Sequence, residues 1–238
     1  MARINVACTS DTHGMIDEVF ANCFGNDRIA KPDVMVFAGD VAPSDFGVVA
    51  SDYIRKVFFE AVRKHPETEF VYTPGNHDFF AQQWDKFEKD VPRNFHFLLD
   101  GDCEICGLRF YGSPWVPYIN GCWAFECDDE DELYDLFGLI PSHVDVLVTH
   151  SPPRIRHEQI DVSLQFEGGS RPFGSQALYE NIVSKKPRYE VCGHIHSGDH
   201  SEIDIPHGDG SFTACFNVSH VDERYFPTYK PTIISIEV

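Results

Sequence analysis

Side chains that could bind metal ions gather in five short clusters along this 238-residue chain. The clusters read Asp-x-His, Gly-Asp, Gly-Asn-His-Asp, Thr-His and Gly-His-x-His. Carboxylates, imidazoles and an amide oxygen form a mixed nitrogen and oxygen ligand set without a thiolate, which argues against a structural zinc site. The candidate metal ligands are Asp11, His13, Asp40, Asn76, His150, His194 and His196.

This ligand set is too large for one tetrahedral ion, whereas two ions that share a carboxylate would use all of it. Two-metal sites hold their ions roughly 3.5–4 Å apart and stabilise both the attacking and the leaving oxygen of a displacement. Each cluster alone is a weak signal, since Asp-x-His and Gly-Asp are common in turns and paired histidines can lie on a surface. All five in this order are difficult to explain by chance, so we predict a dinuclear metal site.

Apolar runs precede the clusters and have the length and composition of buried strands. In open α/β sheets, sites form at the carboxyl ends of strands, where side chains from separate strands converge. We expect Gly39, Gly75 and Gly193 to allow sharp turns of the backbone there. The five predicted strands are residues 4–8, 34–38, 69–73, 144–149 and 189–192.

Helical patterns alternate with these runs. Residues 15–29 are expected to be partly helical, residues 44–65 to form a long amphipathic helix that Pro66 ends, and residues 79–87 to form another helix. The acidic run at residues 128–132 is typical of the solvated start of a helix. Further strands are expected at residues 95–98, 104–106, 108–111, 211–218 and 232–238.

The length of the chain fits one larger α/β domain. No repeat or linker divides it, so residues 1–238 are expected to form a single domain. Residues 158–175, rich in glycine and polar residues, predict a long loop, and long loops in compact domains are often functional.

Acidic residues outnumber basic ones by 38 to 19, which gives a formal net charge of −19. Such a surface repels nucleic acid over long distances, so long nucleic acids are not expected as partners. A solvated acidic surface that keeps the protein soluble is the simplest explanation. A small phosphate ester can still bind where metal ions reverse the local field.

The 8 cysteines form no regular framework. Cys103 and Cys106 are a lone CxxC, whereas zinc sites of that type usually have two pairs. Cys8 and Cys192 lie in apolar runs and are expected in the core. Without a leader or an apolar stretch long enough to span a membrane, we expect a cytoplasmic protein with no membrane partner. The sequence leaves the oligomeric state open.

The five clusters, taken in order, resemble the motif set of calcineurin-like metallophosphoesterases. The resemblance extends from Asp11 to His196 and implies an α/β fold, a four-layer αββα sandwich of two mixed β-sheets flanked by helices. Two divalent ions are the implied cofactors, and Mn, Fe and Zn all suit the ligands. The resemblance implies one ion held by Asp11, His13, Asp40 and His196, and another held by Asp40, Asn76, His150 and His194, with Asp40 bridging.

Four further segments carry a narrower resemblance: residues 112–115 (Gly-Ser-Pro-Trp), 123–125 (Trp-Ala-Phe), 149–153 (Thr-His-Ser-Pro-Pro) and 216–219 (Phe-Asn-Val-Ser). They are similar to the metallophosphoesterase-domain-containing subgroup and to class III cyclic nucleotide phosphodiesterases. That resemblance implies hydrolysis of a small phosphodiester, with cyclic nucleotides among the candidates. Trp115 and Trp123 could line the site or equally pack in the core.

Protein serine/threonine phosphatases of this superfamily differ at two points. They carry an arginine soon after the Gly-Asp motif, and their third cluster ends in glutamate. Here no arginine in register follows Asp40, and the third cluster ends in Asp78. A phosphoprotein substrate is therefore disfavoured.

The expected reaction is the attack of a metal-activated hydroxide on phosphorus, because a metal can lower the pKa of water from about 15.7 towards about 7. His77 is surplus to the ligand count and is expected to protonate the leaving group as the general acid. Asp78 could orient the motif or cap the helix that follows it.

Other functions would use the same residues: a phosphomonoesterase or protein phosphatase, a DNA nuclease, or a non-catalytic binding protein. A nuclease would usually need a basic track, which the sequence lacks. A binding protein that kept only the fold would have lost a ligand or His77, and all are present. The remaining histidines are expected to be structural or exposed, namely His65, His96, His143, His157, His200, His207 and His220.

Overall fold

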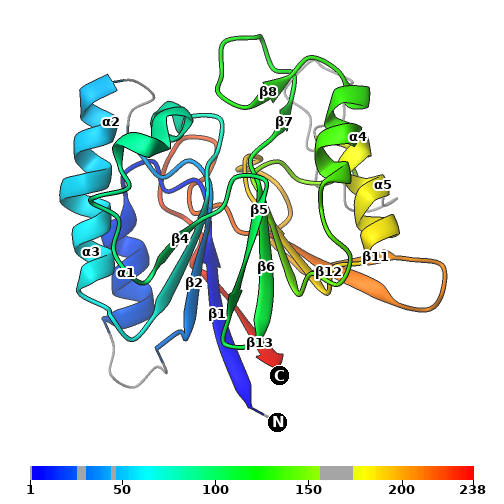
Figure 1. Ribbon diagram of the computed structural model, residues 1–238, viewed down its shortest axis with the longest axis horizontal. Coiled ribbons are helices and arrows are strands. Elements are labelled where there is room, and N and C mark those ends of the chain that lie inside the picture. Colours follow the sequence, from blue (N-terminus) through cyan, green and yellow to red (C-terminus); the bar gives the residue numbers. More distant parts are fainter. Residues whose placement is uncertain (1, 26–30, 44–46, 156–173) are drawn as a thin grey trace.

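The computed structural model describes residues 2–25, 31–43, 47–155 and 174–238. Two β-sheets lie face to face, and helices cover the outer face of each (Figure 1). Three apolar clusters fill the spaces between helices and first sheet, between the two sheets, and between second sheet and helices. The predicted α/β sandwich of two mixed sheets flanked by helices is confirmed.

The first sheet consists of β1 (Arg3–Thr9), β2 (Val34–Ala38), β3 (Glu69–Thr73), β4 (Phe95–Phe97) and β13 (Thr232–Glu237). Its strand order is β13-β1-β2-β3-β4, with β1 to β4 parallel and β13 antiparallel to β1. Val36 of β2 faces the second sheet, and the next residue, Phe37, faces the helices. Parallel strands that are covered on both faces appear in a sequence as continuous apolar runs, which is why these strands could be predicted.

The second sheet consists of β5 (Gly101–Ile105), β6 (Leu108–Ser113), β9 (Val146–Thr149), β10 (Tyr189–Cys192), β11 (Ile203–Pro206) and β12 (Phe212–Asn217). Its order is β11-β12-β10-β9-β6-β5, and only the outer strands β5 and β11 are antiparallel to their neighbours. The strand expected at residues 104–106 lies at Gly101–Ile105, because Cys106 and Gly107 have positive φ and form the turn.

Three strands were missed. β11 has four residues that alternate between buried and exposed. β7 (Val116–Pro117) and β8 (Glu126–Cys127) pair with each other outside both sheets and have two residues each. Strands this short leave little pattern in a sequence.

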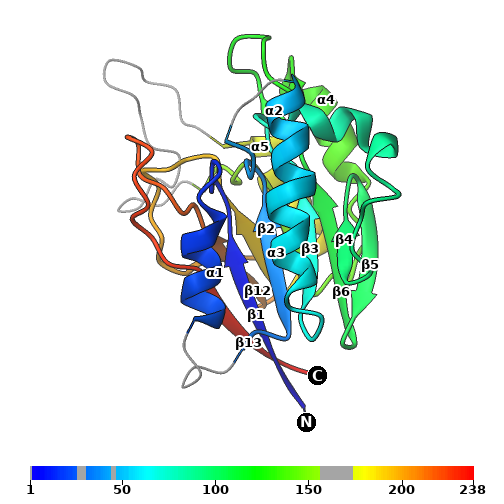
Figure 2. The ribbon, with the colours of Figure 1, turned by 90° about the vertical axis from the view of Figure 1, so that its left-hand side faces the viewer.

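The helices are α1 (Ile16–Phe24), α2 (Gly47–Tyr53), α3 (Phe59–Arg63), α4 (Glu130–Gly138) and α5 (Gln176–Lys185), with the π-helical turn η1 (Ile54–Phe58) and the 3₁₀ segment η2 (Phe79–Lys86). Figure 2 shows α1, α2 and α3 in front of the first sheet. Together α2, η1 and α3 run through residues 47–63 of the helix expected at residues 44–65, of which residues 44–46 lie outside the described residues. The helix expected at residues 79–87 is instead 3₁₀, with non-helical backbone at Gln83.

The acidic run begins α4 as predicted, because the Asp129 carboxylate accepts a hydrogen bond from the Glu132 backbone N–H at 2.8 Å. Helix α5 was not predicted. The expected loop at residues 158–175 lies outside the described residues except for its last two positions.

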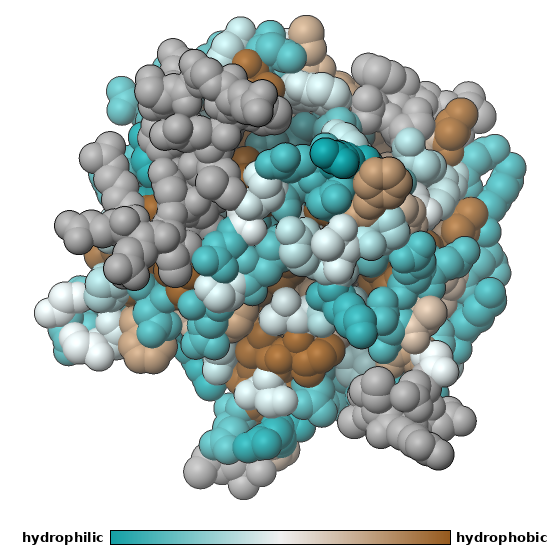
Figure 3. All heavy atoms as spheres, turned by 180° about the vertical axis from the view of Figure 1, so that it is seen from behind, coloured by the Kyte–Doolittle hydropathy of each residue, from teal (hydrophilic) through white to brown (hydrophobic). Residues whose placement is uncertain are grey.

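The strands that precede the five clusters end at one edge of the molecule, where the loops from both sheets meet. On the face shown in Figure 3, hydrophilic side chains predominate and hydrophobic ones gather in small patches. Among the helices in the described ranges, none is long and apolar enough to cross a membrane.

Candidate metal centre

The candidate ligands sit on backbone of unusual conformation. Asp11, His13, Asp40 and His194 have φ values of 50°, 41°, 53° and 67°. Few residues other than glycine adopt the left-handed region, although Asp, Asn and His do so more often than others. Such conformations cost about 1–3 kcal/mol each and persist only where the surroundings enforce them, typically at functional sites.

Three glycines let the ligand loops approach one another. Gly39, with φ of 99°, makes the sharp turn that we expected. Gly75 and Gly193 do not have positive φ, and they serve by their lack of a side chain. A Cβ atom at Gly75 would lie 2.2 Å from an oxygen of Asp40, and one at Gly193 would lie 2.2 Å from an oxygen of Asp11.

Main-chain hydrogen bonds join the ligand loops beyond the ends of the strands. The backbone N–H of Asp11 donates to the carbonyl of Gly39 at 3.0 Å, within the first sheet. In the second sheet, the N–H of Gly193 donates to the carbonyl of His150 at 2.9 Å. These bonds fix the backbone of the loops that carry the candidate ligands relative to one another.

Asp78 adds a side-chain link between two of these loops. Its carboxylate accepts hydrogen bonds from the backbone N–H groups of Asp40 at 2.7 Å, Gly75 at 2.9 Å and Val41 at 3.2 Å. It makes no capping hydrogen bond to the segment that follows it. Of the two roles considered from the sequence, Asp78 thus orients the motif.

A first group of possible ligand atoms comes from Asp11, His13 and His196, which lie within 4.8 Å of one another. The Nε2 atom of His196 is 3.3 Å from Oδ1 of Asp11. Nε2 of His13 is buried and has no hydrogen-bond partner among the described residues, and Oδ1 of Asp11 is buried beside the His196 imidazole. Buried polar atoms are rarely left unsatisfied, and a cation bound between these atoms would give Nε2 of His13 a partner.

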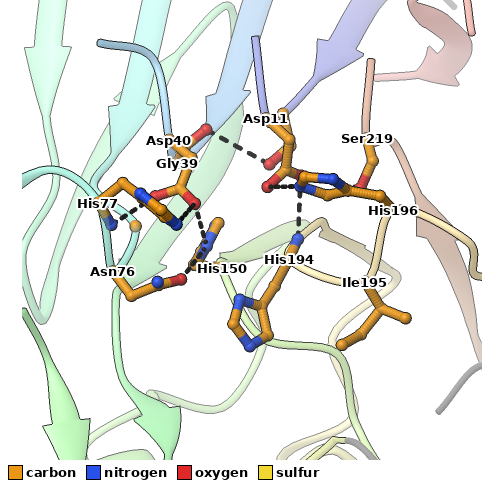
Figure 4. Close-up of polar contacts among 12 residues, drawn as sticks. Asp11, Gly39, Asp40, Asn76, His77, His150, His194, Ile195, His196 and Ser219 are labelled. Atoms are coloured by element: carbon orange, nitrogen blue, oxygen red, sulfur yellow. Dashed lines mark hydrogen bonds and ion pairs between the residues drawn. The ribbon is translucent and has the colours of Figure 1, made fainter. Parts of the chain in front are cut away.

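A second group consists of Asp11, Asp40 and His150, also within 4.8 Å of one another. Nε2 of His150 lies 3.2 Å from Oδ2 of Asp40 and 3.0 Å from Oδ1 of Asn76 (Figure 4). The other ring nitrogen, Nδ1, is 2.8 Å from the carbonyl oxygen of Ala38. A proton on Nδ1 would donate to that carbonyl and leave Nε2 free to coordinate an ion.

The two groups share Asp11, whereas the family resemblance gave the bridging position to Asp40. The Asp11 carboxylate is held on its Oδ2 side by the Ser219 hydroxyl at 2.8 Å and the His194 backbone N–H at 2.9 Å. The His194 ring belongs to neither group but lies beside His150, with ring centroids 5.1 Å apart. The assignment of ligands to individual ions stays a prediction.

Charge balance in the site also fits a cation. Burial alone would raise the pKa values of the Asp11 and Asp40 carboxyls, but the neighbouring imidazoles outweigh it and hold both well below their ordinary range. Burial opposes a charge on His150 as well, yet Asp40 raises its pKa to about 9. Burial, followed by the charge on His150, lowers the pKa of His194 to about 3. The ionised carboxylates and the raised pKa of His150 thus show that positive charge is stabilised between them, as it would be for a cation bound there.

His77 lies beside the ligand groups at the wall of an open cavity of about 440 Å³. Its backbone N–H donates to Oδ1 of Asp40 at 2.8 Å, and its Nε2 atom is 4.0 Å from Oδ2. Its ring centroid is 5.1 Å from that of His13. The other residues that line the cavity are His13, Met15, Pro43 and Tyr225.

The two tryptophans that the sequence left undecided have different surroundings. Trp115 donates its indole N–H to Asp100 at 2.7 Å and packs against the apolar clusters, so it is a core residue. Trp123 lies at the site, with its ring centroid 4.3 Å from that of His77.

Sequence reasoning missed three further residues near the ligands. Ser219 contacts Asp11, and the carbonyl of Asp222 lies 3.2 Å from Nδ1 of His196. Tyr225 packs on His13 and His196. Ser219 belongs to the segment 216–219, which carries part of the narrower resemblance, whereas no local pattern in the sequence marks Asp222 or Tyr225.

The remaining histidines that the structure describes belong to neither ligand group. His65 stacks on Phe24, and His96 pairs with Glu69 at 2.7 Å. His200 stacks on Tyr229. His143, His207 and His220 have no ring contact with the ligands, and His157 lies outside the described residues.

Comparison with known proteins identifies the family of this chain. The family model described as calcineurin-like phosphoesterase matches residues 4–198. Human metallophosphoesterase domain-containing protein 1 is 27% identical over an alignment 253 residues long, gaps included. The alignment covers 96% of this chain and 70% of that protein.

Solved structures share the fold. Phosphopantetheinyl hydrolase (PptH) from Mycobacterium tuberculosis superposes with a TM-score of 0.56 at 14% identity, over 98% of this chain and 95% of that one. The protein TT1561 of Thermus thermophilus superposes with a TM-score of 0.55, also at 14% identity, over 98% of both chains. At such low identity the likeness concerns the fold alone.

Proposed function

Because this chain belongs to the calcineurin-like phosphoesterase family and is therefore a phosphate-ester hydrolase, we propose that it cleaves a small phosphodiester at a two-metal site. One observation carries the proposal. Within the described residues, two groups of possible ligand atoms share the buried Asp11 carboxylate, and they lie beside a cavity that is also lined by the surplus imidazole of His77. Two ions that share a carboxylate are the arrangement used in phosphoryl displacement.

The proposed ligands are the seven residues named from the sequence, with Asp11 or Asp40 as the shared carboxylate. Bound divalent ions would supply Lewis acidity towards the phosphoryl oxygens and lower the pKa of a water molecule. Mn, Fe and Zn all suit donors of this kind. The buried Nε2 of His13, which has no hydrogen-bond partner among the described residues, supports the presence of a cation.

His77 is the proposed general acid. Its backbone N–H to Asp40 fixes its position, and its ring lines the cavity without belonging to either ligand group. A proton on its imidazole could pass to the leaving oxygen as the ester bond breaks, an effect typically worth about 10²–10⁴-fold in rate.

Small substrates suit this site better than polymers. The cavity of about 440 Å³ is in the range of small-molecule sites. The net charge of −19 opposes long polyanions, whose affinity depends on neutralising many phosphates. No arginine in register follows Asp40, which disfavours phosphoproteins.

The test is a comparison of kcat/KM, with one metal at a time, for an aryl phosphodiester, a cyclic nucleotide, an aryl phosphomonoester, a phosphopeptide and duplex DNA. We expect the diesters to be the best substrates. Preference for the monoester would discard the diester proposal and keep the site. Preference for the phosphopeptide, or efficient duplex cleavage at physiological salt, would contradict the substrate argument.

A further inference from the structure

Tyr225 forms part of the cavity wall, and it comes from a segment beyond the part of the chain that matches the family model. Its ring centroid lies 4.8 Å from that of His13 and 5.2 Å from that of His196, in edge contacts. Its side chain is half exposed, with 50% of its surface open to solvent. A large aromatic ring is thus kept partly in water beside the candidate metal ligands.

The turn that carries Tyr225 is held by several hydrogen bonds. The Asp222 carboxylate accepts from the backbone N–H groups of Arg224 and Phe226, both at 2.9 Å. The Tyr225 N–H donates to the Asp222 carbonyl at 2.9 Å. That carbonyl also lies 3.2 Å from Nδ1 of His196, so the turn and the ligand share an anchor.

The backbone of Tyr225 is strained. Its φ is 61°, in the left-handed region, where a bulky side chain is a clear outlier. Asparagine or glycine would fit this position better. Backbone strain of this kind clusters at active sites and ligand-binding loops. The hydrogen bonds of Asp222 enforce the conformation, and its result is that the ring is placed against the two histidines.

A row of four rings results, in which each ring contacts the next: Tyr225, His13, His77 and Trp123. The two imidazoles in the middle are those of His13, a candidate metal ligand, and His77, the proposed general acid. Tyr225, at one end of the row, lines the cavity, where it could contact the part of a substrate that extends away from the phosphoryl group. Aromatic faces bind planar organic groups by stacking, with little demand on their identity.

We propose that Tyr225 is a substrate-specificity residue whose ring binds the organic group of the phosphate ester and thereby favours aromatic over small alkyl esters. The proposal rests on the proposed function, since it assumes that the phosphoryl group binds at the candidate ligands. The ring is the part of the side chain that the proposal uses, because Tyr225 lines the cavity and its ring packs on His13.

The test measures binding of two phosphonates, which have a P–C bond in place of the ester and are not hydrolysed. Phenylphosphonate and methylphosphonate share the charged group and differ in the ring. Dissociation constants are measured calorimetrically on the metal-loaded protein. For the wild type we expect phenylphosphonate to bind about five- to tenfold more tightly, near the low end of aromatic stacking.

Three variants isolate the ring. Tyr225→Phe should keep the preference. Asparagine suits the left-handed backbone, so Tyr225→Asn should reduce the ratio of the methylphosphonate to the phenylphosphonate dissociation constant to about one. The affinity for methylphosphonate and the metal content should be unchanged. Phe226→Ala is the matched control, because Phe226 lies in the same turn, is 61% exposed and does not line the cavity. It should keep the wild-type ratio.

Several results would overturn the proposal: no preference in the wild type, an unchanged ratio in Tyr225→Asn, or loss of the ratio in Tyr225→Phe. Loss of metal or of methylphosphonate binding in Tyr225→Asn would also do so, since the residue would then support His13 and His196 instead. Phosphonate binding needs no turnover. A ring-dependent preference in a protein that cleaves no diester would therefore contradict only the proposed function.

Discussion

Glu190 offers a test of how the buried carboxylates of the second sheet affect stability. It lies in the middle of β10 and is fully buried. One carboxylate oxygen accepts a hydrogen bond from the Thr149 hydroxyl at 2.8 Å, and the thiols of Cys192 and Cys215 lie beside the carboxylate. Burial raises the pKa of this carboxyl from 4.5 to about 7. Because Glu190 is outside the ligand groups, its effect can be separated from metal binding.

The sign of the effect follows from the raised pKa. Below about pH 4.5 the carboxyl is protonated in both the folded and the unfolded chain. As the pH rises towards 7, the unfolded chain releases the proton while the folded chain keeps it, so stability falls. At about 1.4 kcal/mol per pH unit, the full loss is about 3 kcal/mol, of which about 2 kcal/mol lies between roughly pH 5.5 and 8.5.

Glu190→Gln removes the titration and keeps an oxygen for Thr149. We expect the free energy of unfolding of the variant, minus that of the wild type, to increase by about 2 kcal/mol from roughly pH 5.5 to 8.5. Urea unfolding in the presence of a chelator measures this difference, in which the titrations of all other groups cancel. Glu104→Gln, at an exposed carboxylate of β5, is the matched control for the removal of one carboxyl group. Parallel pH profiles for the Glu190 variant and the wild type would refute the reasoning.

Three further predictions concern the candidate metal centre. His77→Ala should lower kcat by about 10²–10⁴-fold with metal content retained, and the decrease should be smaller for a substrate with an activated aryl leaving group. Asp40→Asn should lose metal as well as activity, and equal metal loss in the two variants, measured by elemental analysis, would reject the acid role of His77. Ser219→Ala removes the hydroxyl that donates to Asp11, so metal titration should show an affinity about 10–100-fold weaker, and an unchanged affinity would mean that this contact is dispensable. Gly75→Ala should abolish hydrolysis of the aryl phosphodiester, because the new Cβ would lie 2.2 Å from an Asp40 oxygen. An active variant would show that the loops of Gly75 and Asp40 can move apart.

The strands that carry the site could be predicted because burial and position coincide in the sequence. β2 is buried along its whole length, and the Gly39-Asp40 pair follows it at once. The two-sided cover of a parallel strand removes polar residues, so the first polar residues mark its end. The same reasoning selected the other candidate ligands.

Other parts of the site depend on contacts between distant segments. Asp78 binds the backbone of Asp40, 38 residues earlier, and nothing local distinguishes this role from a helix cap. The left-handed turn at Tyr225 is anchored by Asp222, whose carbonyl contacts His196 across 26 residues. Helix α5 could have been found, since Ser175 caps it and Leu178 and Ile182 are buried at helical spacing.

The main-chain hydrogen bonds between the ligand loops have a consequence for ion exchange. The loops of Asp11 and Gly193 are tied to their neighbours through backbone groups, so we expect their backbone not to rearrange if an ion binds. Little backbone conformational entropy would then be lost on binding. Selection among Mn, Fe and Zn would depend on how well each ion fits this spacing and on its abundance. We expect the rate of metal uptake to be set by the ion's release of its own water molecules, and not by a rearrangement of the chain.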